Sequence, residues 1–198
     1  MSRLILASAS TSRAKILRNA GVDFTVEPAH VDEDAVKDSM RAAKQSHRAV
    51  ADALAELKAQ RVSSQYPQDF VIGADQVLSF NGWLVSKCTT MAEARNLLSE
   101  LRGKSHELLS AVVLAKGGSV IWRHVEKATL TVREFSGEFL DHYLETNGES
   151  LLSGVGCYRL EGDGAQLFAK MDGDYFAILG LPLIPLLSAL REQGVIPA

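Results

Sequence analysis

The residues best suited to chemistry begin close to the N-terminus, where a short apolar run gives way to a helical pattern. Three serines and two cations gather at this junction: Ser8, Ser10, Ser12, Arg13 and Lys15. Backbone N–H groups at a helix start, joined by hydroxyls and positive side chains, converge on an anion. The junction therefore predicts a phosphate-binding turn. A simpler interpretation stays open, in which Ser10 only caps the helix and the cations are solvated.

Acidic side chains occur at two distant places in the chain. Asp75 ends an apolar strand signal, and a carboxylate at the carboxyl end of a strand points into the crevice where α/β proteins bind ligands. The second place is the turn Asp32-Glu33-Asp34. If one of these carboxylates meets Asp75, the pair would suit Mg²⁺ or Mn²⁺, which prefer carboxylate, water and phosphate oxygens. Together with the turn at Ser8, this predicts metal-assisted phosphate chemistry.

Other reactive residue types give weaker signals. Lys58 and Lys87, taken singly, have the character of surface lysines. The five histidines lack the spacing of a metal site, and the GxSxG pattern of serine hydrolases and the P-loop pattern are both absent. The two cysteines, Cys88 and Cys157, imply neither a disulfide scaffold nor a zinc site.

Composition places the chain among ordinary soluble globular proteins. Its 198 residues are 46% apolar, with a net charge of −3. The absence of a Lys/Arg block argues against a nucleic-acid-binding surface. The longest nearly uncharged stretch, residues 175–190, contains two prolines and is shorter than the ~20 apolar residues of a membrane helix. No secretory signal is recognisable at the N-terminus, so we expect no membrane association and a cytoplasmic location.

Periodicity and turn signals predict alternating strands and helices. In the first part we expect strands over 4–7, 24–26 and 69–75, a helix from Ser10 to Gly21, a long helix over 40–62, and a hairpin turning at Asn81-Gly82. Further on we expect a helix opened by the capping box at Thr90, two long strands over 107–115 and 120–132, and helices from Ser136 to Asn147 and over 182–193. The pattern predicts one α/β domain spanning residues 1–198, with a mixed, twisted sheet and flanking helices, bent into two lobes around a central cleft.

An ordered set of short motifs resembles the Maf family of nucleotide pyrophosphatases over nearly the whole chain. The motifs are Leu4–Ser10 with Arg13, Val31–Glu33, Leu57–Ala59, Val71–Asp75, Lys87, Leu101–His106 and Gly180–Leu183. The resemblance implies a fold related to the inosine triphosphatases. It also implies hydrolysis of a nucleoside triphosphate to a monophosphate and pyrophosphate with a divalent metal, Mg²⁺ or Mn²⁺. A house-cleaning role against non-standard nucleotides, a homodimer and a link to cell-division arrest would follow from the same resemblance.

The resemblance also assigns roles to individual residues. Asp75 would accept a proton and, with Glu33, bind the metal, and the phosphates would be contacted by Ser8, Arg13, Lys58 and Lys87. Cations and a metal would stabilise charge developing on the leaving pyrophosphate. Whether Asp75 deprotonates the attacking water directly or orients it on the metal stays open.

Departures from the family pattern bear on the substrate. Ser12 replaces an arginine, and Cys88 replaces a proline. Gln76 and Glu161 resemble the branch that acts on 7-methyl-GTP rather than the thymidine/uridine-nucleotide branch, whereas Ser12 matches neither. A carboxylate such as Glu161 accepts hydrogen bonds from guanine N1–H and the exocyclic amine, and it favours a cationic methylated purine. We therefore expect a preference for guanine-type triphosphates.

Two other functions remain open from the sequence. The first is a nucleotide-binding regulator of cell division with little turnover, for which Asp75 would be unnecessary. The second is a phosphate-ester hydrolase that releases orthophosphate instead of pyrophosphate.

Overall fold

One mixed sheet runs through the chain in the computed structural model, which describes residues 2–197. Its strands within those residues are β1 (Leu4–Leu6), β2 (Thr25–Val26), β3 (Phe70–Phe80), β4 (Trp83–Val85), β5 (Ser105–Lys116), β6 (Ser119–Val132) and β7 (Phe168–Asp172). The order is β2-β1-β3-β5-β6-β7, with β4 paired to β3. β1 runs parallel to β2 and β3, whereas β4 is antiparallel to β3 and β7 to β6. The predicted α/β class with a mixed sheet and flanking helices is therefore confirmed.

The helices begin mostly where the sequence offers a side-chain cap. They are α1 (Thr11–Asn19), α2 (Glu33–Ala42), α3 (His47–Gln65), α4 (Met91–Leu101), α5 (Gly137–Asn147), α6 (Tyr175–Ile178) and α7 (Leu183–Glu192), with short 3₁₀ helices η1 (Gly148–Ser153) and η2 (Asp163–Leu167). Ser10, Thr90 and Ser136 each accept a hydrogen bond from a backbone N–H of the first turn, as predicted. No helix in residues 2–197 is long and apolar enough to cross a membrane.

The chain divides into two compact units. The first contains the residues up to Gln76, Leu109–Lys127 and the residues from Asp174 onward, and the second contains Val77–Leu108 and Ala128–Gly173. β3, β5 and β6 therefore each contribute residues to both units. Two units agree with the expected two lobes, while the central cleft and the single domain over 1–198 stay predictions.

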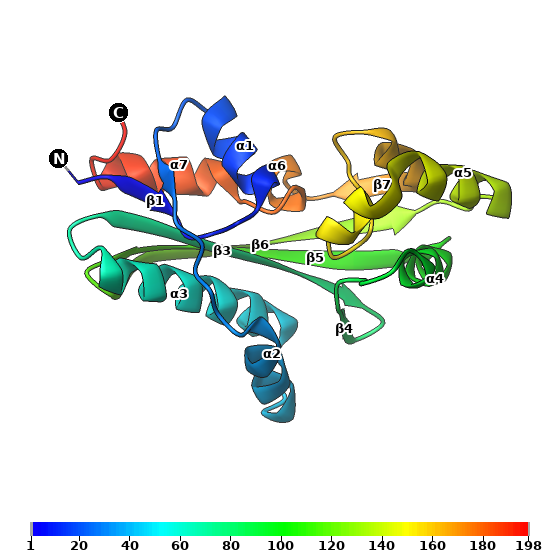
Figure 1. Ribbon diagram of the computed structural model, residues 1–198, viewed down its shortest axis with the longest axis horizontal. Helices are drawn as coiled ribbons and strands as arrows, with labels where there is room; N and C mark the ends of the chain where they lie inside the picture. Colours follow the sequence, from blue (N-terminus) through cyan, green and yellow to red (C-terminus); the bar gives the residue numbers. More distant parts are fainter. Residues whose placement is uncertain (1, 198) are drawn as a thin grey trace. The chain divides into compact units, whose positions relative to one another are not determined.

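The core of the first unit follows from the alternation of side chains along its strands. Even-numbered residues of β1 and β3, such as Leu6 and Ile72, pack in one cluster with side chains of α1 and α7. Odd-numbered residues, such as Ile5 and Val71, pack in another with Val62 of α3. Figure 1 shows α1 and α7 on one face of these strands and α3 on the other. Even-numbered residues of these strands therefore face α1 and α7, and odd-numbered residues face α3.

The single helix predicted over 40–62 is wrong. The structure contains α2 and α3, separated by a break at which Lys44 adopts a left-handed φ of 53° and Ser46 caps α3. The acidic turn is the start of α2, because the Asp32 side chain accepts a hydrogen bond from the Ala35 N–H. Carboxylates at a helix start are stabilised by the helix dipole. The preference of helix starts for acidic residues therefore explains most of the acidic sequence Asp32-Glu33-Asp34.

The second unit is built from a hairpin and a group of packed helices. Asn81 and Gly82 have φ values of 50° and 81°, the two positive angles that a type I′ turn requires, and they join β3 to β4 as predicted. α4 packs against α5 and η1. α4 carries an apolar face of buried leucines: Leu97, Leu98 and Leu101.

Candidate active site

A buried lysine lies between two carboxylates in the first unit. Lys58 Nζ is 2.7 Å from Asp75 Oδ1 and 2.6 Å from Glu33 Oε1. Lys58 and Asp75 are only 7% and 5% exposed. Since buried charges of this kind are stable only when they are paired, one ammonium group holds both carboxylates in place. We call Glu33, Lys58 and Asp75 the charged cluster.

The sequence brings these three residues together through β3 and α3. Asp75 is an odd-numbered residue of β3 and so faces α3, which carries Lys58. Gly73, on the same face, lets the helix approach closely, because a Cβ there would lie 2.6 Å from the Ala59 nitrogen. Glu33 is the first residue of α2, which packs against α3. The sequence predicted Asp75 and Glu33 as a pair, and the structure places both on the same ammonium.

The turn between β1 and α1 is organised around Ser8 and Arg13. The Ser8 hydroxyl oxygen accepts hydrogen bonds from Arg13 Nη1 at 3.1 Å and from the Ser10 N–H at 3.3 Å. Arg13 Nε donates to the Gly180 carbonyl at 2.8 Å. Burial of the guanidinium lowers the pKa of Arg13, although part of the residue remains accessible, and the charges of Asp75 and Glu33 act in the opposite direction. Arginine nonetheless remains a cation in proteins.

Only part of the predicted serine-rich cluster faces this turn. The Ser10 hydroxyl accepts from the Arg13 N–H, so it acts as the helix cap, which is the simpler of the two interpretations. Ser12 is half-buried and Lys15 is exposed, both within α1. The groups available for an anion are therefore the start of α1, the Ser8 hydroxyl and the Arg13 guanidinium.

Gln76 lies on the face of β3 opposite to Asp75. Its Nε2 donates to Ser110 Oγ at 2.8 Å and to the carbonyls of Ala177 and Ile178 at 3.0 Å each. Because these three atoms accept hydrogen bonds, the amide nitrogen must face them, and Gln76 presents its carbonyl oxygen on the other side. A Cβ on Gly180 would lie 3.9 Å from that oxygen.

Sequence reasoning gave no role to Ser110 or to the carbonyls of α6. The Ser110 hydroxyl donates to the Ala177 carbonyl at 2.7 Å, so it joins the group that fixes Gln76. Gly180 adopts a φ of 104°, which favours glycine, and its carbonyl fixes Arg13. The motif at Gly180 was visible in the sequence, whereas the Ser110 contact spans distant segments and left no local signal.

The remaining predicted site residues belong to the second unit. Lys87 is exposed after β4, and Glu161 is exposed between η1 and η2. Their roles toward phosphate and base stay predictions. Tyr158, near Glu161 in the sequence, packs edge-on against Phe168 with ring centroids 4.9 Å apart. Its hydroxyl hydrogen-bonds with His106 Nε2 at 2.7 Å, so Tyr158 is largely occupied by protein contacts.

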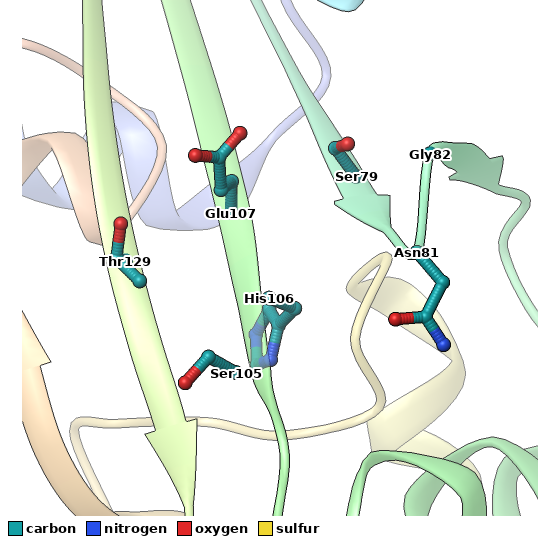
Figure 2. Close-up of a pocket in the computed structure, with 7 residues that line it drawn as sticks. All are labelled: Ser79, Asn81, Gly82, Ser105, His106, Glu107 and Thr129. Atoms are coloured by element: carbon teal, nitrogen blue, oxygen red, sulfur yellow. The ribbon is translucent and has the colours of Figure 1, made fainter.

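The second unit also contains a polar hollow of about 290 Å³. Figure 2 shows the residues that line it, which come from β3, β5, β6 and the turn after β3: Ser79, Asn81, Gly82, Ser105, His106, Glu107 and Thr129. Burial lowers the pKa of His106 to about 4, so its imidazole is neutral at pH 7. Its Nδ1 has no hydrogen-bond partner among the described residues. None of the predicted phosphate-binding or metal-binding residues lines this hollow.

The charged cluster fits a divalent cation that is shared with a ligand. Within residues 2–197, no group of three or more His, Cys, Asp or Glu side chains is placed to hold a metal by itself. The cluster supplies two carboxylates whose summed charge exceeds that of Lys58 by one negative unit. Mg²⁺ is commonly bound by one or two carboxylates together with substrate phosphates and water. The donor set of Asp75 and Glu33 therefore suits such an ion.

The fold and these groups describe an α/β protein equipped to bind a phosphorylated ligand. Residues 3–193 match the family model described as "Maf-like protein". The chain belongs to the Maf family. It is 53% identical over 191 residues to the "Nucleoside triphosphate pyrophosphatase" of Granulibacter bethesdensis, covering 96% of this chain and 97% of that protein. It is 46% identical over 194 residues to the "7-methyl-GTP pyrophosphatase" of Rhizobium etli, covering 98% of both chains.

Proposed function

We propose that this protein hydrolyses nucleoside triphosphates to the monophosphate and pyrophosphate. The names of its Maf-family relatives support this activity. The observation in the structure that carries the proposal is the buried Lys58 ammonium between Asp75 and Glu33. A carboxylate and an ammonium lie in the same cluster, and they would supply the proton acceptor and the cation that hydrolysis of a phosphate anhydride needs.

In this proposal the triphosphate is bound by two cations and by hydrogen-bond donors. In the first unit the cations are Arg13 and Lys58, and the donors are the Ser8 hydroxyl and the N–H groups at the start of α1. Arg13 is already held by Ser8 and Gly180, so little side-chain freedom is lost when phosphate binds. In this proposal Lys87 adds a further contact from the second unit.

Asp75 is proposed to accept the proton of the attacking water or to orient that water. Its Oδ1 is fixed by Lys58, which keeps the carboxylate in one position. Asp75 and Glu33 would hold Mg²⁺ or Mn²⁺. When bound, that ion supplies Lewis-acid stabilisation of charge on the phosphate oxygens. When no metal ion is bound, Lys58 keeps the two carboxylates oriented toward a common point.

Replacement of the proton acceptor tests the proposal. Asp75→Asn keeps the size of the side chain and should lower kcat by at least about a hundredfold, the usual contribution of a general base. Asp69→Asn is the matched control, because Asp69 is another buried carboxylate, located just before β3, but it pairs with Arg3 at 2.7 Å. The control should lose stability and keep kcat. Pyrophosphate release by Asp75→Asn at the wild-type rate would refute the role of Asp75.

For the substrate we propose a guanine-type triphosphate, including 7-methyl-GTP. Relatives from Rhizobium etli and Rhizobium meliloti bear the name 7-methyl-GTP pyrophosphatase. The exposed Glu161 carboxylate would accept hydrogen bonds from the base, and Gln76 would contribute an acceptor oxygen, because its nitrogen faces protein acceptors. Comparing kcat/KM for 7-methyl-GTP, GTP, UTP and dTTP tests this preference, and fastest turnover of dTTP would contradict it.

The same assay separates the other expectations attached to the resemblance. Tight nucleotide binding without product would favour a regulator of cell division, and orthophosphate as product would favour a different hydrolase. Homodimer formation is a further part of the proposal and is measured by sedimentation. A cytoplasmic location, where nucleotide pools are found, completes it.

A further inference from the structure

Two side chains from the sheet hold the last carbonyl groups of α6. A helix leaves its final carbonyls without partners inside the helix, so they need donors from elsewhere. Ser110 of β5, which is 1% exposed, donates its hydroxyl proton to the Ala177 carbonyl at 2.7 Å. The Gln76 amide nitrogen of β3 donates to the same carbonyl and to that of Ile178, at 3.0 Å each. The end of α6 is therefore fixed to β3 and β5.

The Ala177 carbonyl also connects this group to Gly180. It accepts the Gly180 N–H at 2.9 Å, and the Gly180 carbonyl in turn accepts the Arg13 Nε–H at 2.8 Å. Gly180 is buried and has a φ of 104°, which side-chain-bearing residues rarely adopt, so the direction of its carbonyl is closely defined. A continuous series of hydrogen bonds thus runs from Ser110 through Ala177 and Gly180 to Arg13, all within the first unit.

We propose that Ser110 is a positioning residue for the Arg13 guanidinium. Among the three donors at the Ala177 carbonyl, the Ser110 hydroxyl lies closest, at 2.7 Å against 2.9 and 3.0 Å. Without this hydroxyl the Ala177 peptide has room to turn, and Gly180 and Arg13 shift with it. Arg13 keeps its second hydrogen bond, to Ser8 at 3.1 Å, so the guanidinium is displaced but stays at the turn. The effect on turnover rests on the proposed function, in which Arg13 binds phosphate.

Ser110 has a second contact that leads toward the base, through Gln76. The Ser110 hydroxyl oxygen accepts a hydrogen bond from the Gln76 amide nitrogen at 2.8 Å. If Ser110 is removed, that nitrogen still faces the carbonyls of Ala177 and Ile178, so the amide oxygen still points away from them. The acceptor that Gln76 would offer to a base is therefore kept. Loss of Ser110 should weaken the binding of phosphate, which all nucleoside triphosphates share, and leave the selection among bases unchanged.

The first test is the kinetics of Ser110→Ala. Since misplacement of a binding group by about 1 Å can cost up to a hundredfold in rate, we expect kcat/KM to fall at least about tenfold. The fall should be the same for every triphosphate that the wild type hydrolyses. Ser110→Thr keeps a hydroxyl and should restore most of the loss. Ser63→Ala is the matched control, because Ser63 is another buried serine, bonded to the Gly118 N–H at 3.0 Å, and it should lose stability and keep kcat/KM.

A double variant tests whether Arg13 is the intermediary. Arg13→Met alone removes the guanidinium that Ser110 is proposed to position. In the Arg13→Met background, Ser110→Ala should therefore lower kcat/KM no further, because residues that act through one another are not additive.

NMR reads the position of Arg13 without turnover. The Arg13 Nε–H signal, assigned by its loss in Arg13→Lys, should exchange with solvent faster in Ser110→Ala than in the wild type, since its bond to Gly180 is weakened. Ser110→Cys keeps the size of the side chain and hydrogen-bonds only weakly, so it provides the same test if the alanine variant does not fold.

Four results would overturn the proposal. The first two are unchanged kcat/KM and unchanged exchange of the Arg13 Nε–H in Ser110→Ala. The third is a changed ratio of kcat/KM between bases, which would assign Ser110 to base selection through Gln76. The fourth is additive losses in the double variant, which would exclude Arg13 as the intermediary. If the wild type releases no pyrophosphate, the proposed function fails, while the Arg13 Nε–H signal still decides whether Ser110 positions the guanidinium.

Discussion

At the scale of single residues, the charged cluster depends on one lysine. Lys58 is the group that allows Asp75 to remain buried near Glu33, because without an ammonium between them two negative charges would face each other. The lysine therefore has a structural task as well as the phosphate-binding role proposed for it. These two tasks are separable by mutation.

Lys58→Met should destabilise the protein by about 3–5 kcal/mol, since it leaves a buried carboxylate without a partner. Adding Asp75→Asn in the same chain removes the unpaired charge and should recover much of that loss without restoring turnover. Urea denaturation of the three variants measures the coupling. Lys37→Met is the control, because Lys37 lies 3.7 Å from Glu33 at the surface and should change stability by less than about 1 kcal/mol. Additive losses in the double variant would contradict a direct pairing of Lys58 with Asp75.

His106 should make stability depend on pH. Its folded-state pKa is lowered to about 4 by burial, whereas an unfolded histidine titrates near 6.5. Between these values the unfolded chain binds a proton that the folded chain does not, so the free energy of unfolding falls as the pH falls from about 6.5 to about 4, by up to about 3 kcal/mol.

His106→Gln removes the titrating ring and keeps an amide for Tyr158. The difference in stability between wild type and this variant should therefore vary with pH in that window. His142→Gln, on the exposed side of α5, is the control and should leave the pH profile of the wild type intact. If the free energy of unfolding of His106→Gln changed with pH in parallel with that of the wild type, the lowered pKa of His106 would not be the cause of the pH dependence.

At the scale of elements, the contact of α3 with β3 positions Lys58 against Asp75. Gly73→Ala should cost about 1–3 kcal/mol or more, because the new methyl group would meet the backbone of α3 at Ala55 and Ala59. Because α3 carries Lys58, kcat should also fall. Gly137→Ala is the control, since no atom lies within 4 Å of its Cβ position, and it should be nearly neutral. Equal stabilities of the two variants, measured by thermal unfolding, would argue against close packing at Gly73.

Elements with strong local signals could be predicted from the sequence. The caps at Ser10, Thr90 and Ser136 and the Asn81-Gly82 turn act within a few residues, so their patterns are visible. The break before Ser46 was missed because Lys44, neither glycine nor proline, adopts the left-handed conformation there. β7 was missed because its side chains are mostly exposed and show no alternation of apolar residues.

The candidate site also contains one residue with a local sequence signal and several contacts without such a signal. Asp75 could be singled out because it is a carboxylate that follows an apolar stretch. The prediction that it ends a strand is wrong, because β3 continues to Phe80 and Asp75 lies in its middle. The pairing of Asp75 with Lys58 could not be derived from spacing, because it depends on how α3 lies on the sheet. The ties of Gln76 to Ser110 and Ala177 join segments far apart in the chain, and only tertiary packing brings them together.

At the scale of the whole molecule, folding should not require a bound metal. Lys58 already neutralises one of the two negative charges of Asp75 and Glu33, so the fold does not need a divalent ion there. Removal of metal by a chelator should abolish pyrophosphate release and leave the thermal midpoint unchanged, and Mg²⁺ or Mn²⁺ should restore activity. A fall in the midpoint on chelation would show that an ion supports the fold itself.

The first unit contains residues from both halves of the chain, so it cannot complete its fold until the later residues have been synthesised. Ser8 and Arg13 are synthesised before the Gly180 carbonyl that holds Arg13, and before the leucines of α7 that pack in one cluster with β1 and β3. Until α7 has been synthesised, part of this apolar cluster lacks its cover, and exposed apolar surface of this kind attracts chaperones. Premature termination before α7 would leave that part of the cluster uncovered and direct the fragment to proteolysis.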